Sequence, residues 1–121
     1  MAGRLGTDAD IILSESILSR ILDVMDSMLI EKDQAGIVLS GNILTDQNGP
    51  YAVISSIGED SPIGICVASS EGGTEPTDGE LALFKSRLSE GIMMKVDVFV
   101  HQFSFYKIGE TVEDATVLFS E

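Results

Sequence analysis

The sequence predicts a single α+β domain of an α/β-like three-layer type, with a mixed β-sheet and two main helices. The 121 residues match the size of one domain, and the 44% of hydrophobic residues suffice for a packed core. Stretches of helical spacing alternate with short β-type stretches in the order α-β-β-β-α-β-β-β, which is typical of such domains. We therefore expect a flexible leader over residues 1–10 and one folded unit over residues 11–121.

The first helix is predicted over residues 15–30. Hydrophobic residues recur there at spacings of three and four, which places them on one face of a helix. They are Ile17, Leu18, Ile21, Leu22, Met25, Met28 and Leu29. Ser14 stands immediately before this stretch, and serine is a preferred N-cap residue. We expect the hydrophobic face to pack on one side of the sheet.

Three strands are expected after a polar break. Residues 36–44 are too β-branched for a helix, and residues 51–57 follow Asn48 and Gly49, whose pairing is typical of a hairpin turn. Residues 63–68 form a third stretch that is almost wholly apolar. Such a stretch is typical of a central strand covered on both faces.

A second helix is predicted to open at Pro76 and to run through Leu88. Thr77 and Glu80, three residues apart, form the pattern of a capping box. The apolar face of this helix consists of Leu81, Phe84 and Leu88. Three more strands are expected at residues 96–100, 103–108 and 116–119, and the first two should form a hairpin.

The composition excludes several classes of function. Twenty acidic residues against seven basic ones give a formal net charge of −13, which argues against a nucleic-acid or anionic-membrane surface. No apolar run is long enough to span a membrane, and the first residues lack the pattern of a signal peptide, so we expect a cytoplasmic protein. One cysteine and one histidine exclude an intrachain disulfide and any site that needs two imidazoles from one chain.

Four segments share their order and spacing with a known family. Residues 12–17 (ILSESI) look like its strand-to-helix opening, and residues 34–41 (QAGIVLSG) look like its E-x-G-G-x-L-x-G strand. Residues 64–80, with GICVASS and then PTDGE, look like G-x-x-H-x-H-P…P-S-x-x-D, and residues 105–110 look like its final strand pair. Over about residues 11–119 the chain thus resembles the JAB/MPN (JAMM) domain, including its RadC-like branch. The resemblance implies a JAB/MPN-like (cytidine-deaminase-like) architecture.

The same resemblance implies that the family's zinc chemistry is missing. In active members a glutamate acts as general base, two histidines and an aspartate hold zinc, and a serine supports the intermediate. Here the position of the general base falls on Gln34 and those of the two histidines fall on Val67 and Ser69. The position of the aspartate falls on Glu80 and that of the serine on Thr77. An amide accepts no proton and valine donates no electron pair, whereas catalytic zinc needs about three protein ligands. We therefore expect degenerate active-site positions with no catalytic residue, no bound metal and no cofactor.

The resulting hypothesis is a non-catalytic JAB/MPN-like domain, a pseudoenzyme that serves as a protein-binding or assembly module. Its acidic surface would favour a protein partner or peptide that is basic. The resemblance and the strand ends also make a homodimer plausible. Two alternatives stay open: a zinc-dependent JAMM-type isopeptidase or peptidase whose ligands are misassigned, and an acidic domain that binds a small molecule.

Several candidate residues have simpler structural interpretations. The capping box explains Thr77 and Glu80, and Gln34 fits an ordinary polar residue at the entrance of a strand. Cys66 and His101 have the chemistry of a nucleophilic pair, but strand alternation turns Cys66 away from the face of Val67. A structural imidazole and a buried thiol are therefore the preferred interpretation.

Two loops and one pair of methionines complete the candidates. The carboxylates of Glu59-Asp60 and of Glu71 and Glu75 match no EF-hand spacing, so a solvated rim is preferred to a cation site. Gly72-Gly73 lacks the spacing and the lysine of a phosphate loop. Met93-Met94 fit a core better than an exposed contact surface, although methionine also suits adaptable surfaces.

Overall fold

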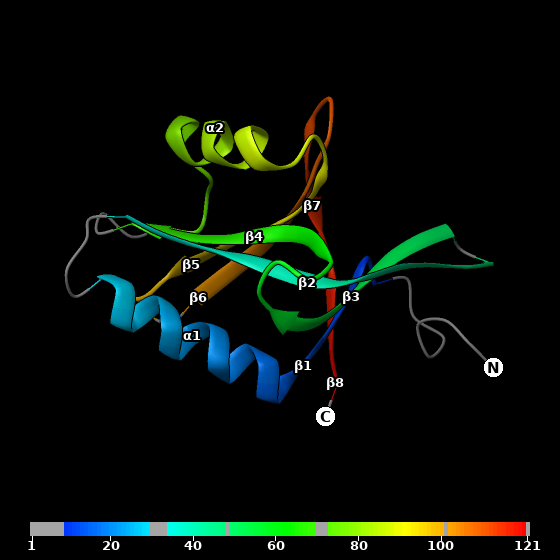
Figure 1. Cartoon of the computed structure of the whole chain (residues 1–121), viewed down its shortest axis with the longest axis horizontal. Helices are drawn as coiled ribbons and strands as arrows, with labels where there is room; N and C mark the ends of the chain where they lie inside the picture. Colours follow the sequence, from blue (N-terminus) through cyan, green and yellow to red (C-terminus); the bar gives the residue numbers. More distant parts are fainter. Residues whose placement is uncertain (1–8, 30–33, 48, 70–72, 101, 121) are drawn as a thin grey trace.

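The computed structural model of the chain describes residues 9–29, 34–47, 49–69, 73–100 and 102–120. Eight strands and two helices lie within these ranges (Figure 1). In chain order they are β1 (Ile11–Ser14), α1 (Glu15–Leu29), β2 (Gln34–Asp46), β3 (Gly49–Ile57), β4 (Pro62–Ser69), α2 (Asp78–Arg87), β5 (Gly91–Asp97), β6 (Gln102–Ile108), β7 (Val112–Ala115) and β8 (Val117–Ser120). None of the described helices is long and apolar enough to cross a membrane.

All eight strands belong to one sheet, in the order β7-β6-β5-β4-β2-β3-β1-β8. Strand β1 runs parallel to β3 and β8, and β4 runs parallel to β5. The other neighbours are antiparallel, including the predicted hairpin β2–β3 and the hairpin β5–β6. The first strand of that second hairpin was expected at residues 96–100, but it lies at residues 91–97, and residues 98–100 form the turn. The prediction of a mixed sheet with two main helices is therefore correct in these respects.

The two ends of this sheet are joined by a single stretch of chain. Strand β7 pairs with β6 at one end and β8 pairs with β1 at the other, and only Thr116 separates β7 from β8. The backbone N–H groups of Asp10 and Ile11 both donate to the Thr116 carbonyl, and Thr116 N–H donates to the Asp10 carboxylate. The sheet therefore curls into a nearly closed cylinder.

The predicted α+β three-layer class is wrong, because strands make up most of the ordered structure and curl around the core. The two helices have only 15 and 10 residues. The sequence pattern missed part of the sheet, since residues 91–95 and 112–115 were assigned to no element, and the predicted strand at residues 116–119 corresponds to β8 alone. Residues 1–8 of the expected leader lie outside the described part of the chain.

Helix α1 packs against the face of the sheet that carries the main core. Ile21 and Met25 are completely buried there, as the helical spacing predicts. The Ser14 hydroxyl accepts a hydrogen bond from Ile17 N–H at 3.2 Å, which confirms the predicted cap. The core cluster takes residues from every strand from β1 to β6, and so fills the inside of the curled sheet.

Helix α2 lies on the opposite face, over β4, β5 and β6 (Figure 1). Its anchor is Phe84, which is completely buried in a second cluster with Ile65, Val67, Met93, Tyr106 and Ile108. The neighbouring Met94 lies in the main core, so both methionines are core residues. Gly91 begins β5 with a φ of 152°, and a Cβ there would lie 2.4 Å from the Ile63 carbonyl oxygen, so only glycine fits.

Candidate functional site

The positions assigned by the resemblance gather where β2, β4 and α2 meet. Gln34, at the start of β2, pairs in register with Ser69, at the end of β4. The side chains of these two residues lie outside the described part of the structure. Val67 is completely buried on β4, and α2 brings Thr77 and Glu80 to the same face. The structure thus brings together Val67, Thr77, Glu80 and the strand ends that carry Gln34 and Ser69.

A buried ion pair occupies the centre of this site. Lys95 on β5 is 0% exposed and Glu80 is 3% exposed. The Lys95 ammonium donates hydrogen bonds to both carboxylate oxygens of Glu80, at 2.7 Å to Oε1 and 2.5 Å to Oε2. Both charges are thus removed from water and neutralise each other, which a buried charge requires.

The capping box positions the Glu80 carboxylate. Thr77 Oγ1 accepts a hydrogen bond from Glu80 N–H at 3.1 Å, and Glu80 Oε1 accepts one from Thr77 N–H at 2.8 Å. This confirms the predicted capping box, but the box explains only half of the role of Glu80. Its carboxylate also anchors the first turn of α2 to the ammonium group on β5.

Sequence reasoning missed Lys95, although a weak signal was present. The residue interrupts the otherwise apolar run IMMKV, at residues 92–96. Strand alternation places Lys95 on the same face as Met93, toward α2, and register places it beside Val67. A lysine in such a run indicates a buried partner of opposite charge, because lysine is almost never fully buried without one.

A zinc ion does not fit these residues. Val67 offers no donor atom, and both oxygens of Glu80 already accept hydrogen bonds from a cation. The Lys95 ammonium would also repel a divalent ion at this place. Among the described residues, no group of three or more His, Cys, Asp and Glu side chains could hold a metal.

The cysteine lies apart from this site, as predicted. Cys66 is completely buried in the main core, whereas its neighbour Val67 belongs to the α2 cluster on the opposite face. Burial raises the pKa of the Cys66 thiol far above its usual range, with a further rise from the Glu80 charge that the Lys95 charge opposes. His101, the other member of the proposed pair, lies outside the described residues.

We expect Cys66 to resist alkylation by iodoacetamide in the folded protein and to react only on unfolding. In the unfolded chain the thiol ionises near its ordinary pKa, about 8.5. Because the folded thiol stays neutral at that pH, the free energy of unfolding should fall as the pH rises above this value. Urea titrations at pH 7 and pH 10 measure this loss, and Cys66→Ala should lack it. Rapid alkylation without unfolding would contradict the buried thiol.

The acidic loops show ordinary surface contacts where they are described. Glu59 forms an ion pair with Arg87, and both side chains are exposed. Asp97, the last residue of β5, accepts a hydrogen bond from Gly73 N–H at 2.8 Å, and this bond holds the pKa of Asp97 below its usual value. Glu71 and Gly72 lie outside the described residues. These contacts agree with a solvated rim.

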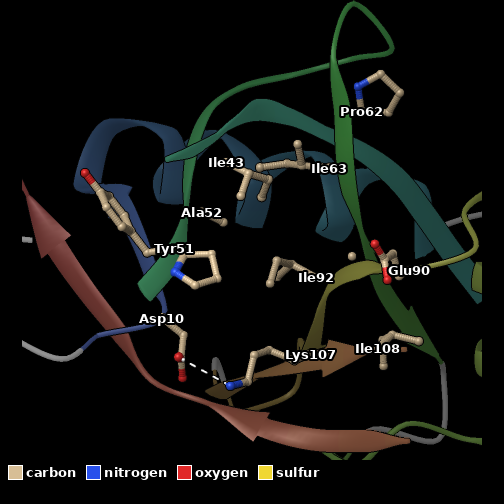
Figure 2. Close-up of a pocket in the computed structure, with 12 residues that line it drawn as sticks. Asp10, Ile43, Tyr51, Ala52, Pro62, Ile63, Glu90, Ile92, Lys107 and Ile108 are labelled. Atoms are coloured by element: carbon tan, nitrogen blue, oxygen red, sulfur yellow. Dashed lines mark hydrogen bonds and ion pairs between the residues drawn. The ribbon is translucent and has the colours of Figure 1, made fainter. Parts of the chain in front are cut away.

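A cleft of about 620 Å³ opens at the opposite end of β4 from the ion pair. Figure 2 shows the residues that line this cleft. Its walls are mainly aliphatic and come from β2 to β6, including Ile43, Ala52, Ile63, Ile92 and Ile108. Asp10, Glu90 and Lys107 supply its charges, and Lys107 Nζ lies 3.4 Å from an Asp10 oxygen. Sequence reasoning missed this cleft, because residues far apart in the chain form it only when the sheet curls.

No protein-family model matches the chain, and no curated protein matches it at a significant level. Among solved structures, the chain is similar to protein DSY2949 from Desulfitobacterium hafniense, at 11% identity and a TM-score of 0.68, over 92% of this chain and 93% of that one. It is also similar to a structure described as JAMM, a metalloprotease-like zinc site in the proteasome and signalosome. That likeness has 16% identity and a TM-score of 0.60, and it covers 89% of this chain and 97% of the other. Likeness at such identities shows the fold alone, and the chain therefore has a JAMM-like fold.

Proposed function

We propose that this chain is a non-catalytic JAMM-like domain that works as a protein-binding or assembly module. The observation that supports the proposal is the Lys95–Glu80 ion pair. The resemblance assigns Glu80 to a ligand of zinc, yet its two oxygens hold the Lys95 ammonium instead. The buried Lys95 ammonium thus neutralises the Glu80 carboxylate, as a bound metal ion would do.

The partner in this proposal is a basic protein or peptide. With a formal net charge of −13, the chain attracts basic surfaces over a distance and repels acidic ones. The same repulsion acts between two copies of the chain, so a homodimer needs specific contacts that outweigh it. Binding to a basic partner should therefore weaken as salt is added.

Calorimetric titration with zinc chloride tests the absence of hydrolase chemistry. We expect the unmodified chain to show no site in the micromolar range or tighter, because its donor set does not fit zinc. Val67→His with Ser69→His should also fail to bind zinc tightly while Lys95 remains, because the ammonium still occupies Glu80. Adding Lys95→Ala to these two changes should create measurable binding.

The triple variant is the control for the assigned positions, since it frees the Glu80 carboxylate and supplies two imidazoles. Circular dichroism establishes that each variant is folded before it is titrated. Stoichiometric, tight zinc binding by the unmodified chain would refute the proposal and favour the zinc-dependent hydrolase.

A further inference from the structure

We propose that the cleft at the end of β4 binds an extended, basic segment of a partner protein, which adds as a strand to the open edge of β2. The proposal deepens the proposed function, on which it rests, by naming the class of partner and its place of docking. It is carried by an open strand edge, an aliphatic cleft beside that edge and the carboxylate of Glu90, which pairs with no cation among the described residues.

The open edge arises because β2 is longer than its neighbour β4. Their pairing ends at Ser40 and Pro62, followed by one hydrogen bond from Gly41 N–H to the Ser61 carbonyl. Beyond that point β2 pairs only with β3, and the two strands project from the sheet as an arm (Figure 1). Within the described residues, no strand covers the other side of residues 42–45. Such an edge is a template for an added strand.

The cleft lies directly beside this edge. Ile43, in the middle of the open stretch, is 56% exposed and lines the cleft with Ile63 and Ile92 (Figure 2). The next residue, Leu44, is 45% exposed and does not line it. Because side chains alternate along a strand, an added strand would direct every second side chain toward these isoleucines. A branched aliphatic side chain suits such walls.

The charges of the cleft favour a basic segment. The Asp10 carboxylate is engaged by Lys107 and by Thr116. Glu90 is exposed at the cleft, and no described residue forms a hydrogen bond or ion pair with its carboxylate. A lysine or arginine two residues from the aliphatic side chain would project on the same side of the added strand and could pair with Glu90.

The same charges disfavour a second copy of the chain as the occupant. Residues 42–45 read Asn-Ile-Leu-Thr and carry no basic group for Glu90, and two copies repel each other through their net charge of −13. A basic peptide gains from both the local and the overall charge. The observations therefore favour a partner segment over pairing between two arms.

The probe is an end-blocked peptide that carries an uncharged fluorophore, Thr-Val-Thr-Lys-Thr-Val-Thr, titrated with the full chain by fluorescence anisotropy at low salt. We expect weak, saturable binding, with a Kd below about 1 mM. A peptide with glutamate in place of lysine should bind about tenfold more weakly. A peptide methylated on alternate backbone nitrogens should also bind about tenfold more weakly, because it cannot donate the backbone hydrogen bonds that pair it with β2.

Variants of the chain locate the site. Ile43→Ser should weaken binding about tenfold, whereas Leu44→Ser, the matched change on the neighbouring side chain, should stay within about twofold. Glu90→Gln should weaken binding about threefold and reduce its salt dependence. Amide signals of residues 42–45 should shift in a heteronuclear NMR titration, and those of α2 should not.

Several results would overturn the inference. These are no binding at a protein concentration of about 1 mM, equal binding of the methylated peptide, and equal effects of Ile43→Ser and Leu44→Ser. Amide shifts at residues 42–45 that depend on protein concentration alone would assign the edge to a second copy. If the chain binds both the peptide and zinc, the docking site stands and the proposed loss of hydrolase chemistry is refuted. If it binds neither, the docking site is refuted and the proposed loss of hydrolase chemistry stands.

Discussion

Replacing Lys95 with methionine is expected to lower the free energy of unfolding by about 3–5 kcal/mol, because the change strands a buried carboxylate without its counter-charge. Glu80 is almost completely buried and both of its oxygens accept hydrogen bonds from Lys95. Methionine has a similar length and fills the space. The decrease in the free energy of unfolding therefore comes from the missing charge and not from a cavity. Urea denaturation at neutral pH measures it.

Two comparisons separate the ion pair from other effects. Lys107→Met breaks an exposed pair with Asp10 and should cost no more than about 1 kcal/mol. Adding Glu80→Gln to Lys95→Met should recover much of the lost stability, because glutamine is uncharged and keeps an oxygen for Thr77 N–H. If the losses of stability from Lys95→Met and Glu80→Gln simply add in the double variant, the two charges are not coupled. The Lys95–Glu80 ion pair then does not stabilise α2.

Truncating Phe84 to alanine is expected to cost about 3–5 kcal/mol, the usual range for a large aromatic side chain in a core. Phe84 is completely buried between α2 and the sheet, where it contacts the cluster that includes Val67 and Met93. The same change at the neighbouring Leu83, whose side chain is 40% exposed, should cost far less. Thermal and urea unfolding measure both.

Hydrogen exchange gives a second measure of the Phe84 prediction. Amides of α2 should exchange faster in Phe84→Ala, while amides of α1 keep their protection, because the two helices belong to different clusters. Similar losses from Phe84→Ala and Leu83→Ala would mean that α2 does not depend on this anchor.

Features set by neighbouring residues could be predicted from the sequence. The spacing of Ile21 and Met25 placed α1, and Ser14 marked its beginning. The pair of Thr77 and Glu80 marked the first turn of α2. Each of these signals acts over three or four residues, so their outcome depends little on the rest of the chain.

Features set by distant residues could not be predicted in this way. The three-layer expectation failed because nothing in the sequence shows that Asp10 and Thr116 meet and curl the sheet. Lys95 belongs to a strand that the pattern left unassigned, and its partner Glu80 lies on another element. The cleft likewise depends on β2 extending beyond the end of β4. The ends of strands are the least reliable part of a prediction from sequence.

The joining of the sheet's ends at Thr116 has a consequence for the timing of folding. Strand β1 is synthesised early, but one of its two neighbours, β8, leaves the ribosome about a hundred residues later, at roughly 5–20 residues per second. During those seconds the outer edge of β1 stays open in the nascent chain and can pair with other chains. The fold can therefore be completed only after residues 117–120 have emerged, and contacts of such long range make the last step slow.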